Sequence, residues 1–489
     1  MVSTPAKRSI TFARANAVPL YRQIYHHFRE AITVGQLRPG NRLPSVRRLA
    51  EEFGTARGTI DAAYAMLAGE GYILSRGPGG TIVSPQLNGS TIGRAAPKRL
   101  AEPTERRGIS APRPFQMGQP SLDAFPRKLW SRVVAHQARQ LSPSDLAYPD
   151  PAGFGPLRDV IAGYLASSRG ITCTSQQILI TNGYQDALGL ISDVLLHGDS
   201  KVWLEDPCYP LVRHALEDAG AKLVPIRVDA EGLRVADGVA HARRARLAVV
   251  TPSHQSPLGV ALSLPRRLAM LSWASDTGAF IVEDDYDSEF RYVGRPLPAL
   301  KSIDRNERVL YAGTFSKVLF PALRLGYLIV PHELAPIFIR ANERRSFGAP
   351  TLGQRAVAAF MADGHFARHI KRMRSLYAGR RQALAEALSA VFGDRVELDL
   401  KPGGMHLIAR IDSGASDVEL ARLAQIAGLA VEALSRRAIT HECRPGLLLG
   451  FTNVAEGDAL DLCDRLDRAI GSQLGHARSK VALRRRRAA

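Results

Sequence analysis

Apolar and polar positions near the start of the chain follow the period of an amphipathic helix. Leu20, Ile24, Phe28 and Ile32 recur every four residues, and Gly35 follows them as a stop signal. This spacing predicts a first helix within about residues 19–36, with its apolar stripe facing a core.

Shorter periodic segments follow at once. The stretch 46–53 predicts a helix that begins after Ser45 and ends at Gly54. RGTIDAAYAMLAGEG has helical spacing again, and YILSRGPGGTIVS predicts two short strands joined by a Gly-Pro-Gly-Gly tip. A helix, a helix-turn-helix and a two-stranded wing together predict a winged helix-turn-helix, mainly α, over residues 17–85.

The pattern changes further along the chain. Residues 86–113 are rich in Gly, Pro, Ser and charge without a sustained period, which predicts a linker. From about 114 to 475 helical segments alternate with short apolar runs, which is typical of a parallel or mostly parallel α/β sheet. A smaller α+β lobe is expected from about 365. The apolar runs are 177–181, 201–204, 247–251, 279–283, 308–312 and 326–330, with 396–400 and 406–411 in the smaller lobe.

Charge adds a hint about partners. The chain carries 65 Lys and Arg against 46 Asp and Glu, a formal charge of +19. The surplus favours a polyanion partner without choosing between nucleic acid and membrane. Part of it lies in the tail, 476–489, which is expected to be a disordered, solvated end.

The spacing of the cysteines and the hydropathy of the chain indicate the cellular compartment. The four cysteines have neither metal-ligand spacing nor the pattern of a disulfide framework, so we expect a reducing compartment and no metal site. The N-terminus has no apolar signal region, and no apolar run is long enough to span a membrane. The sequence therefore predicts a cytoplasmic protein without a membrane partner.

The segment AGTFSKVLFPALRLG, residues 312–326, carries the most specific chemistry. Lys317 lies in a small polar turn with Thr314 and Ser316 just before it and Arg324 seven residues after it. A primary amine can form a Schiff base with an aldehyde cofactor, while hydroxyls and a guanidinium hold its phosphate. These residues point to pyridoxal 5'-phosphate.

Acidic and aromatic residues follow another predicted strand in AFIVEDDYDSEF. A buried Asp284 could pair with a protonated pyridine nitrogen, and Tyr286 could donate to the ring phenolate. Carboxylates at the C-terminal end of a strand lie where open α/β sheets bind ligands. Solvated acids at a strand end are the structural alternative.

Two further segments fit the same cofactor. In TNGYQDAL the backbone N–H groups of Gly183, Tyr184 and Gln185 open a helix and could hold a phosphate, although a simple turn would look the same. Tyr209 in EDPCYPLVRHAL could stack on the cofactor ring or pack in the core. His254 in TPSHQSPLG could contact a ligand or be an ordinary loop residue.

Two family resemblances join these observations. LPSVRRLAEEFGTARGTIDAAYAMLAGEGYI resembles GntR-type DNA-binding domains, and residues 114–470 resemble fold-type I aminotransferases through GTFSKVLFPALRLGY and EDDYDSEF. The combination is similar to the MocR/GabR family of bacterial transcriptional regulators. The resemblance implies a Schiff base on Lys317 and a head-to-tail homodimer to which Tyr148 reaches across from the partner subunit. It also implies that the cofactor or an amino-compound effector sets DNA binding.

Two positions depart from catalytic aminotransferases. Ser256 stands where these enzymes usually have asparagine, and Leu448 stands where they place the arginine that binds the substrate α-carboxylate. Without that guanidinium the bidentate hold on an amino acid is lost, so the sequence puts ordinary transamination in doubt. The arginines that could substitute are Arg213, Arg436, Arg437 and Arg444.

Residues of the helix-turn-helix are expected to contact double-stranded DNA at paired half-sites. Arg57, Gly58 and Thr59 begin the second helix, whose N-terminal residues face base edges in this motif. Ser45 and Arg47 are expected to contact phosphates, and Arg76 lies at the wing. A solvated basic surface is the structural alternative.

Three functions are compatible with the sequence. The first is a regulator that senses pyridoxal phosphate or an amino compound. The second is a working aminotransferase with a DNA-binding appendage, which Leu448 argues against. The third is a DNA-binding protein whose aminotransferase-like body is a scaffold without cofactor.

Overall fold

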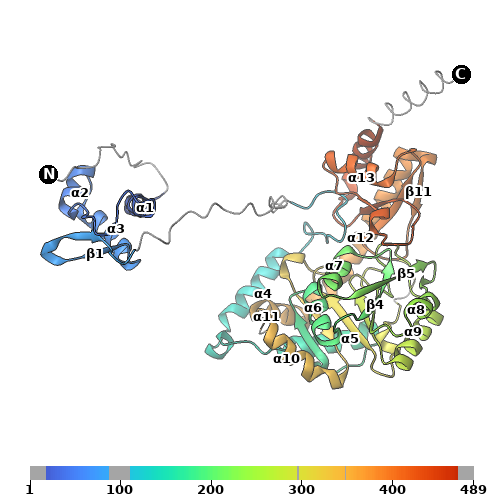
Figure 1. Ribbon diagram of the computed structural model, residues 1–489. Helices are drawn as coiled ribbons and strands as arrows, with labels where there is room; N and C mark the ends of the chain where they lie inside the picture. The colour runs from blue at the N-terminus through green and yellow to red at the C-terminus, as the bar shows by residue number, and fades with distance from the viewer. Residues whose placement is uncertain (1–17, 88–110, 295–296, 347, 472–489) are drawn as a thin grey trace. The chain divides into compact units, whose positions relative to one another are not determined.

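The computed structural model describes residues 18–87, 111–294, 297–346 and 348–471 (Figure 1). Two compact units divide the chain, with the boundary between Ile109 and Ser110. Most of the expected linker and all of the basic tail lie outside the described residues, so the expectations about them stay untested.

The N-terminal unit has the predicted helices and wing. Its elements are α1 (Leu20–Thr33), α2 (Val46–Phe53), α3 (Arg57–Gly69), β1 (Ile73–Ser75) and β2 (Thr81–Val83). Ser45 caps α2 by accepting from the Arg48 N–H at 3.3 Å, and Gly54 closes it in the left-handed conformation with φ 57°. Ile24, Ile60 and Leu67 are fully buried in one apolar cluster, as the helical spacing predicted.

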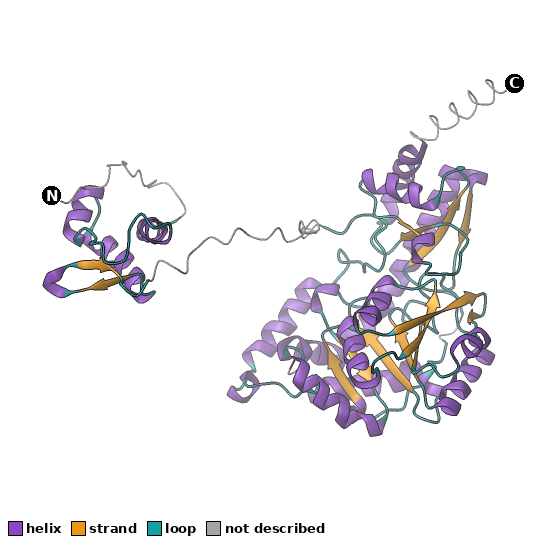
Figure 2. Ribbon diagram, viewed as in Figure 1, coloured by secondary structure: helices purple, strands orange, loops and turns teal. Residues whose placement is uncertain are grey.

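The C-terminal unit consists of a large sheet between helices and a smaller sheet (Figure 2). The large sheet has the order β3-β10-β9-β8-β7-β4-β5-β6. Its strands are β3 (Ile178–Thr181), β4 (Lys201–Asp206), β5 (Lys222–Asp229), β6 (Gly232–Leu233), β7 (Leu247–Val250), β8 (Phe280–Asp285), β9 (Val309–Thr314) and β10 (Gly326–Ile329). The helices before β11 are α4 (Arg127–Arg139), α5 (Gly155–Arg169), α6 (Tyr184–Leu195), α7 (Pro210–Asp218), α8 (Val235–Ala242), α9 (Leu264–Thr277), α10 (Ala335–Ser346), α11 (Thr351–Ala362) and α12 (His365–Phe392).

The five strands from β9 to β5 run parallel, whereas β10 is antiparallel to both β3 and β9. Because successive side chains of a strand point to opposite faces, each strand serves two cores. In β3, Leu179 joins the cluster formed with α6 and α7, while Ile178 and Ile180 join the cluster formed with α5 and α12. Burial on both faces explains the continuous apolar runs that the sequence showed.

The smaller sheet is antiparallel, with the order β11-β12-β14-β13. Its elements are β11 (Val396–Asp399), β12 (His406–Ile411), α13 (Asp417–Ile426), β13 (Glu432–Ala433) and β14 (Leu447–Gly450). Residues 115 and 450 form a β-bridge, so the segment before α4 pairs with the end of β14 in this sheet. The expected smaller α+β lobe is therefore present.

The mostly parallel sheet was predicted, but two of its strands were missed. β5 has an exposed or half-buried residue at most positions because it lies near the edge of the sheet, so it lacks a clear apolar run. β6 has two residues, which is too short for a periodic signal. None of the helices among the described residues is long and apolar enough to cross a membrane.

Candidate functional sites

Lys317 lies in the turn that follows β9, at the C-terminal end of the parallel strands. Its Nζ donates to the carbonyl oxygen of Gly118 at 2.8 Å. A Cβ built on Gly118 would lie 2.6 Å from that Nζ, and its φ is +64°, so glycine is required on both counts. Burial lowers the pKa of Lys317, against the opposing pull of Asp287 and Asp284. The neutral, nucleophilic amine is thereby favoured.

Asp284 is the second-last residue of β8, and no ion pair of its carboxylate is found in the part of the chain that the structure describes. Its pKa is raised to about 8, mainly by burial and also by the neighbouring carboxylates Asp285 and Glu205, while a hydrogen bond from the Tyr184 hydroxyl opposes the shift. The next residue differs, since Asp285 forms an ion pair with Arg169 at 2.7 Å. Asp284 is therefore the carboxyl of this pair that remains open to a cationic partner.

The Tyr184 hydroxyl is buried beside Asp284 without a hydrogen bond of good geometry. A buried polar atom without a partner is costly unless a ligand supplies one. Together with the unpaired carboxyl of Asp284, it shows that the residues here fit the ring nitrogen end of a pyridinium cofactor.

Tyr286 lies against the loop after β7. Its hydroxyl is 3.0 Å from Nδ1 of His254, and Ser256 is close enough to lower its pKa. Burial is the larger influence, and it raises the pKa of Tyr286 well above the ordinary value. Tyr286 therefore stays a protonated donor at neutral pH.

The N-terminus of α6 faces Arg324. Gly183 caps this helix with φ +93°, and a Cβ placed there would lie 3.5 Å from Cζ of Arg324. Arg324 donates to the Asn182 carbonyl at 3.1 Å, so the guanidinium is fixed beside the free N–H groups of the first turn. Ser316 and Thr314 meet in the neighbouring turn, where the Thr314 hydroxyl accepts from the Ser316 N–H at 3.1 Å. A helix N-terminus and a guanidinium together make an anion site.

Tyr209 precedes α7 and is 37% exposed. The guanidinium of Arg437 lies 5.8 Å from the centre of its ring and forms an ion pair with Glu432. Of the four arginines considered as carboxylate partners, Arg213 and Arg444 instead form exposed pairs with Glu217 and Glu397. Arg436 is exposed.

Leu448 is fully buried in β14. It forms an apolar cluster with Ile408 and Leu434, against which Met117, Leu258 and Cys443 pack. An apolar cluster therefore surrounds Leu448, the position at which the sequence comparison expects the arginine of catalytic aminotransferases to be replaced. Tyr148, by contrast, is 84% exposed in the loop before α5.

The sequence did not predict the hydrogen bonds that join residues 439–441 to the end of β4. The Asp206 carboxylate at the end of β4 accepts N–H bonds from Ile439, Thr440 and His441 at 2.7 to 2.8 Å. Gln255 bridges the buried Glu205 and the Pro207 carbonyl. The Glu-Asp pair that ends the apolar run 201–204 was the available signal, but its partners lie far away in the sequence. Gly118 was missed for the same reason.

On the N-terminal unit, Ser45, Arg47 and Arg57 are exposed, as are Gly58 and Arg76, while Thr59 is half-buried. Arg57 is the first residue of α3, and Arg47 forms an exposed ion pair with Glu51 at 3.2 Å. Ser45 serves as the α2 cap, which leaves its role toward phosphate a prediction. The exposed positions Arg38, Arg42 and Arg48 enlarge the basic surface that the sequence had indicated.

A doubly covered sheet, a half-buried lysine beyond β9 and an anion site at α6 define an aminotransferase-like body whose cofactor is pyridoxal phosphate. The winged helix-turn-helix adds a DNA-binding unit. Comparisons with known proteins agree with both parts. Residues 116–441 match the family "Aminotransferase class I and II", and residues 20–83 match "Bacterial regulatory proteins, gntR family".

Among curated proteins, the chain is 36% identical to the probable rhizopine catabolism regulatory protein MocR of Rhizobium meliloti, covering 89% of this chain and 91% of that protein. It is 32% identical to the pyridoxine biosynthesis transcriptional regulator PdxR of Corynebacterium glutamicum, covering 88% and 91%. Among solved structures, Pyrococcus horikoshii kynurenine aminotransferase matches with a TM-score of 0.67 at 27% identity, covering 75% of this chain and 92% of that chain.

The chain therefore belongs to the MocR-type family of transcriptional regulators, in which a GntR-type DNA-binding domain precedes an aminotransferase-like domain.

Proposed function

We propose that this regulator holds pyridoxal phosphate on Lys317 and that the state of this site sets its affinity for DNA. The observation that carries the proposal is the buried amine of Lys317, whose lowered pKa and single carbonyl contact prepare it as a nucleophile. The cofactor supplies the aldehyde and the electron-withdrawing ring.

The other residues take their roles from their positions around that amine. Asp284 would neutralise the pyridinium, which in turn would bring the pKa of Asp284 down from about 8. Tyr286 would donate to the phenolate oxygen, and Tyr209 would cover one face of the ring. Arg324, Thr314 and Ser316, with the N–H groups of Gly183, Tyr184 and Gln185, would hold the phosphate.

The chemistry of the effector follows from the residues near Tyr209. Leu448 offers no charge, because it is fully buried among apolar side chains. Arg437 lies against Tyr209, and its pairing with Glu432 leaves it partly neutralised. We infer that an amino-compound effector with a carboxylate would bind Arg437 in exchange for Glu432, and that an amine without a carboxylate would not need Arg437.

The aminotransferase fold commonly forms dimers, and two exposed side chains support one here. Leu146 and Tyr148 are 75% and 84% exposed in the connection between α4 and α5. Large exposed side chains of this kind favour an interface. We infer a head-to-tail homodimer in which the partner's Tyr148 completes the cofactor site, and which binds paired half-sites on DNA.

A covalent trapping experiment tests the cofactor proposal. Full-length protein is incubated with pyridoxal phosphate, reduced with borohydride, digested and analysed by mass spectrometry. The label is expected on the peptide that contains Lys317, and Lys317→Ala should lose both the label and the visible absorbance band. Lys222→Ala, which changes a lysine 58% exposed on β5, should keep both. Label on another peptide, or on none, would refute the proposal.

A further inference from the structure

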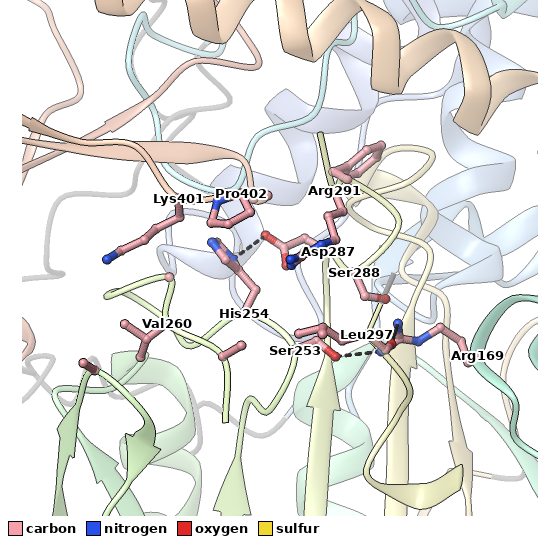
Figure 3. A pocket seen from close by; sticks show the side chains of 16 residues that line it. Arg169, Ser253, His254, Val260, Asp287, Ser288, Arg291, Leu297, Lys401 and Pro402 are labelled. Atoms are coloured by element: carbon pink, nitrogen blue, oxygen red, sulfur yellow. Dashed lines mark hydrogen bonds and ion pairs between the residues drawn. The ribbon is translucent and has the colours of Figure 1, made fainter. Parts of the chain in front are cut away.

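A cavity lies between the large sheet and the smaller lobe (Figure 3). Its volume is about 230 Å³. One side is formed by the loops that follow β7 and β8, and the other by residues 401–404 before β12. The two sides are joined where Tyr292 donates from its hydroxyl to the Gly404 carbonyl at 2.6 Å and from its N–H to the Pro402 carbonyl at 2.8 Å.

Most charged side chains around this cavity are neutralised within the protein. Arg169 pairs with Asp285 at 2.7 Å, and Lys401 pairs with Asp399 at 2.9 Å. Asp287 is the one carboxylate that lines the cavity, and it lies 3.1 Å from Nδ1 of His254. The cations Arg169 and Lys401 are therefore each offset by a carboxylate.

Arg291, which is half-buried, has no ion pair among the described residues, and its Nε is buried without a hydrogen-bond partner. His254, which is 7% exposed, likewise has a buried Nε2 without a partner, and so does Oδ2 of Asp287, although it lies 3.1 Å from Nδ1 of His254. Two unsatisfied nitrogens in one cavity wall are costly unless a ligand or water meets them.

The size and the other walls indicate what kind of ligand this is. The cavity has room for the volume of about eight water molecules, which exceeds a single inorganic ion. Val260, Leu297 and Pro402 supply apolar surface opposite the polar groups. We propose that the cavity binds a small organic carboxylate, with the carboxylate on Arg291, a polar atom near His254 Nε2 and an apolar body against Val260 and Leu297.

This site is distinct from the cofactor site, since Lys317, Asp284 and Tyr209 do not line it. His254 nevertheless connects the two, because its Nδ1 lies against Tyr286 while its Nε2 is in the cavity wall. A ligand held between the two lobes would also fix the contacts at 402–404.

Calorimetric titration of the full-length protein, saturated with pyridoxal phosphate, tests the proposal with butyrate as probe. Butyramide, which has the same shape without the charge, and inorganic phosphate are the comparison compounds. We expect one butyrate per subunit and at least tenfold weaker binding of butyramide. Arg291→Gln should weaken butyrate binding at least tenfold, and Arg291→Lys should weaken it less. The matched control is Arg305→Gln, in the exposed segment that precedes β9 at the opposite end of the strands, and it should leave butyrate affinity within twofold.

Equal binding of butyrate to the native protein and Arg291→Gln would overturn the proposal, as would the absence of binding up to about 50 mM. Phosphate binding without butyrate binding would show an inorganic anion site instead, and would also overturn it. If Arg291→Gln does not fold, the comparison between butyrate and butyramide on the native protein decides. The same titrations are repeated on the cofactor-free protein, so a failure to take up the cofactor does not prevent them and the two proposals can fail separately.

Discussion

At the scale of single residues, burial shifts the pKa values of Lys317 and Asp284 in opposite directions, and one cofactor could interact with both residues. It lowers the pKa of Lys317 and raises that of Asp284 to about 8, because each charged form is poorly solvated there. A cofactor that brings an aldehyde and a cationic ring nitrogen would relieve both. The Tyr184 hydroxyl beside Asp284 stays neutral, because burial raises its pKa well above the ordinary value.

The raised pKa of Asp284 predicts how pH affects the cofactor-free protein. A carboxyl whose pKa is higher in the folded state binds more protons there, so its stabilising contribution is complete below the unfolded pKa and is lost as pH rises toward about 8. Asp284→Asn removes this linkage. We expect the loss of thermal stability between about pH 5 and pH 8 to become shallower, by at most about 1.4 kcal/mol per pH unit.

Thermal unfolding of the cofactor-free proteins across this pH range measures the effect. Asp237→Asn, which changes an acid in the first turn of α8, is the control and should keep the native slope. Glu205 and Glu289, whose pKa values burial raises to about 7, keep part of the slope in both variants. An unchanged slope in Asp284→Asn would show that Asp284 is not protonated in the folded protein.

Arg437 is the second residue with a testable role. Replacing it with glutamine should weaken the response of the cofactor absorbance to amino acids, while the response to amines without a carboxylate should be kept. The physical reason is that only the former need the guanidinium beside Tyr209. Absorbance titrations with glycine and with ethylamine measure this, and Arg444→Gln is the exposed control. If the absorbance response falls equally for glycine and ethylamine in Arg437→Gln, the role of Arg437 is structural.

At the scale of elements, the start of α6 and the start of α3 carry the two kinds of binding. The first turn of α6 would present backbone N–H groups to a phosphate group. The first turn of α3 would present side chains to DNA. At α6 the geometry depends on Gly183, whose φ of +93° other residues rarely adopt.

Gly183→Ala should therefore disturb the phosphate site. We expect the affinity for pyridoxal phosphate to fall about tenfold, which corresponds to about 1.4 kcal/mol. Gly198→Ala is the matched control, because Gly198 also has a positive φ, +52°, but lies in open space. Absorbance titration with cofactor distinguishes them, and equal affinities for both variants would argue against a phosphate at α6.

The N-terminal unit predicts a difference between two arginines. Arg57 begins α3, so Arg57→Ala should reduce discrimination between specific and altered operators by about 1–3 kcal/mol. Arg47→Ala should instead weaken binding to all DNA alike and lower the salt dependence. Anisotropy titrations on both DNAs at several salt concentrations would separate the two effects. The same loss of discrimination in both variants would contradict the assignment of α3.

How far the sequence predicted these elements depended on how local each signal was. The helices of the N-terminal unit and the strands β3, β7 and β8 were predicted because an apolar period or run marks each one. β5 was missed because its position near the sheet edge leaves it only partly buried. Lys317 and Asp284 were found from their motifs, but Gly118 and the loop that Asp206 holds are brought near them only by long-range folding. The cavity at Arg291 had no sequence signal, since its walls come from five separate stretches of the chain.

At the scale of the whole molecule, the chain joins a DNA-binding unit to an aminotransferase-like unit, and we propose that the cofactor therefore has a regulatory role. Leu448 lies in a buried apolar cluster and offers no charged group to an amino acid. The two units are separate compact bodies, so communication between them is best measured on the full-length chain.

The most direct test of this account is the affinity of the full-length protein for the DNA upstream of its own gene, measured by anisotropy at fixed salt with and without pyridoxal phosphate. The account predicts that the cofactor changes the affinity of the native protein at least fivefold and leaves that of Lys317→Ala within twofold. A cofactor effect of equal size in both proteins, or no effect in either, would contradict it.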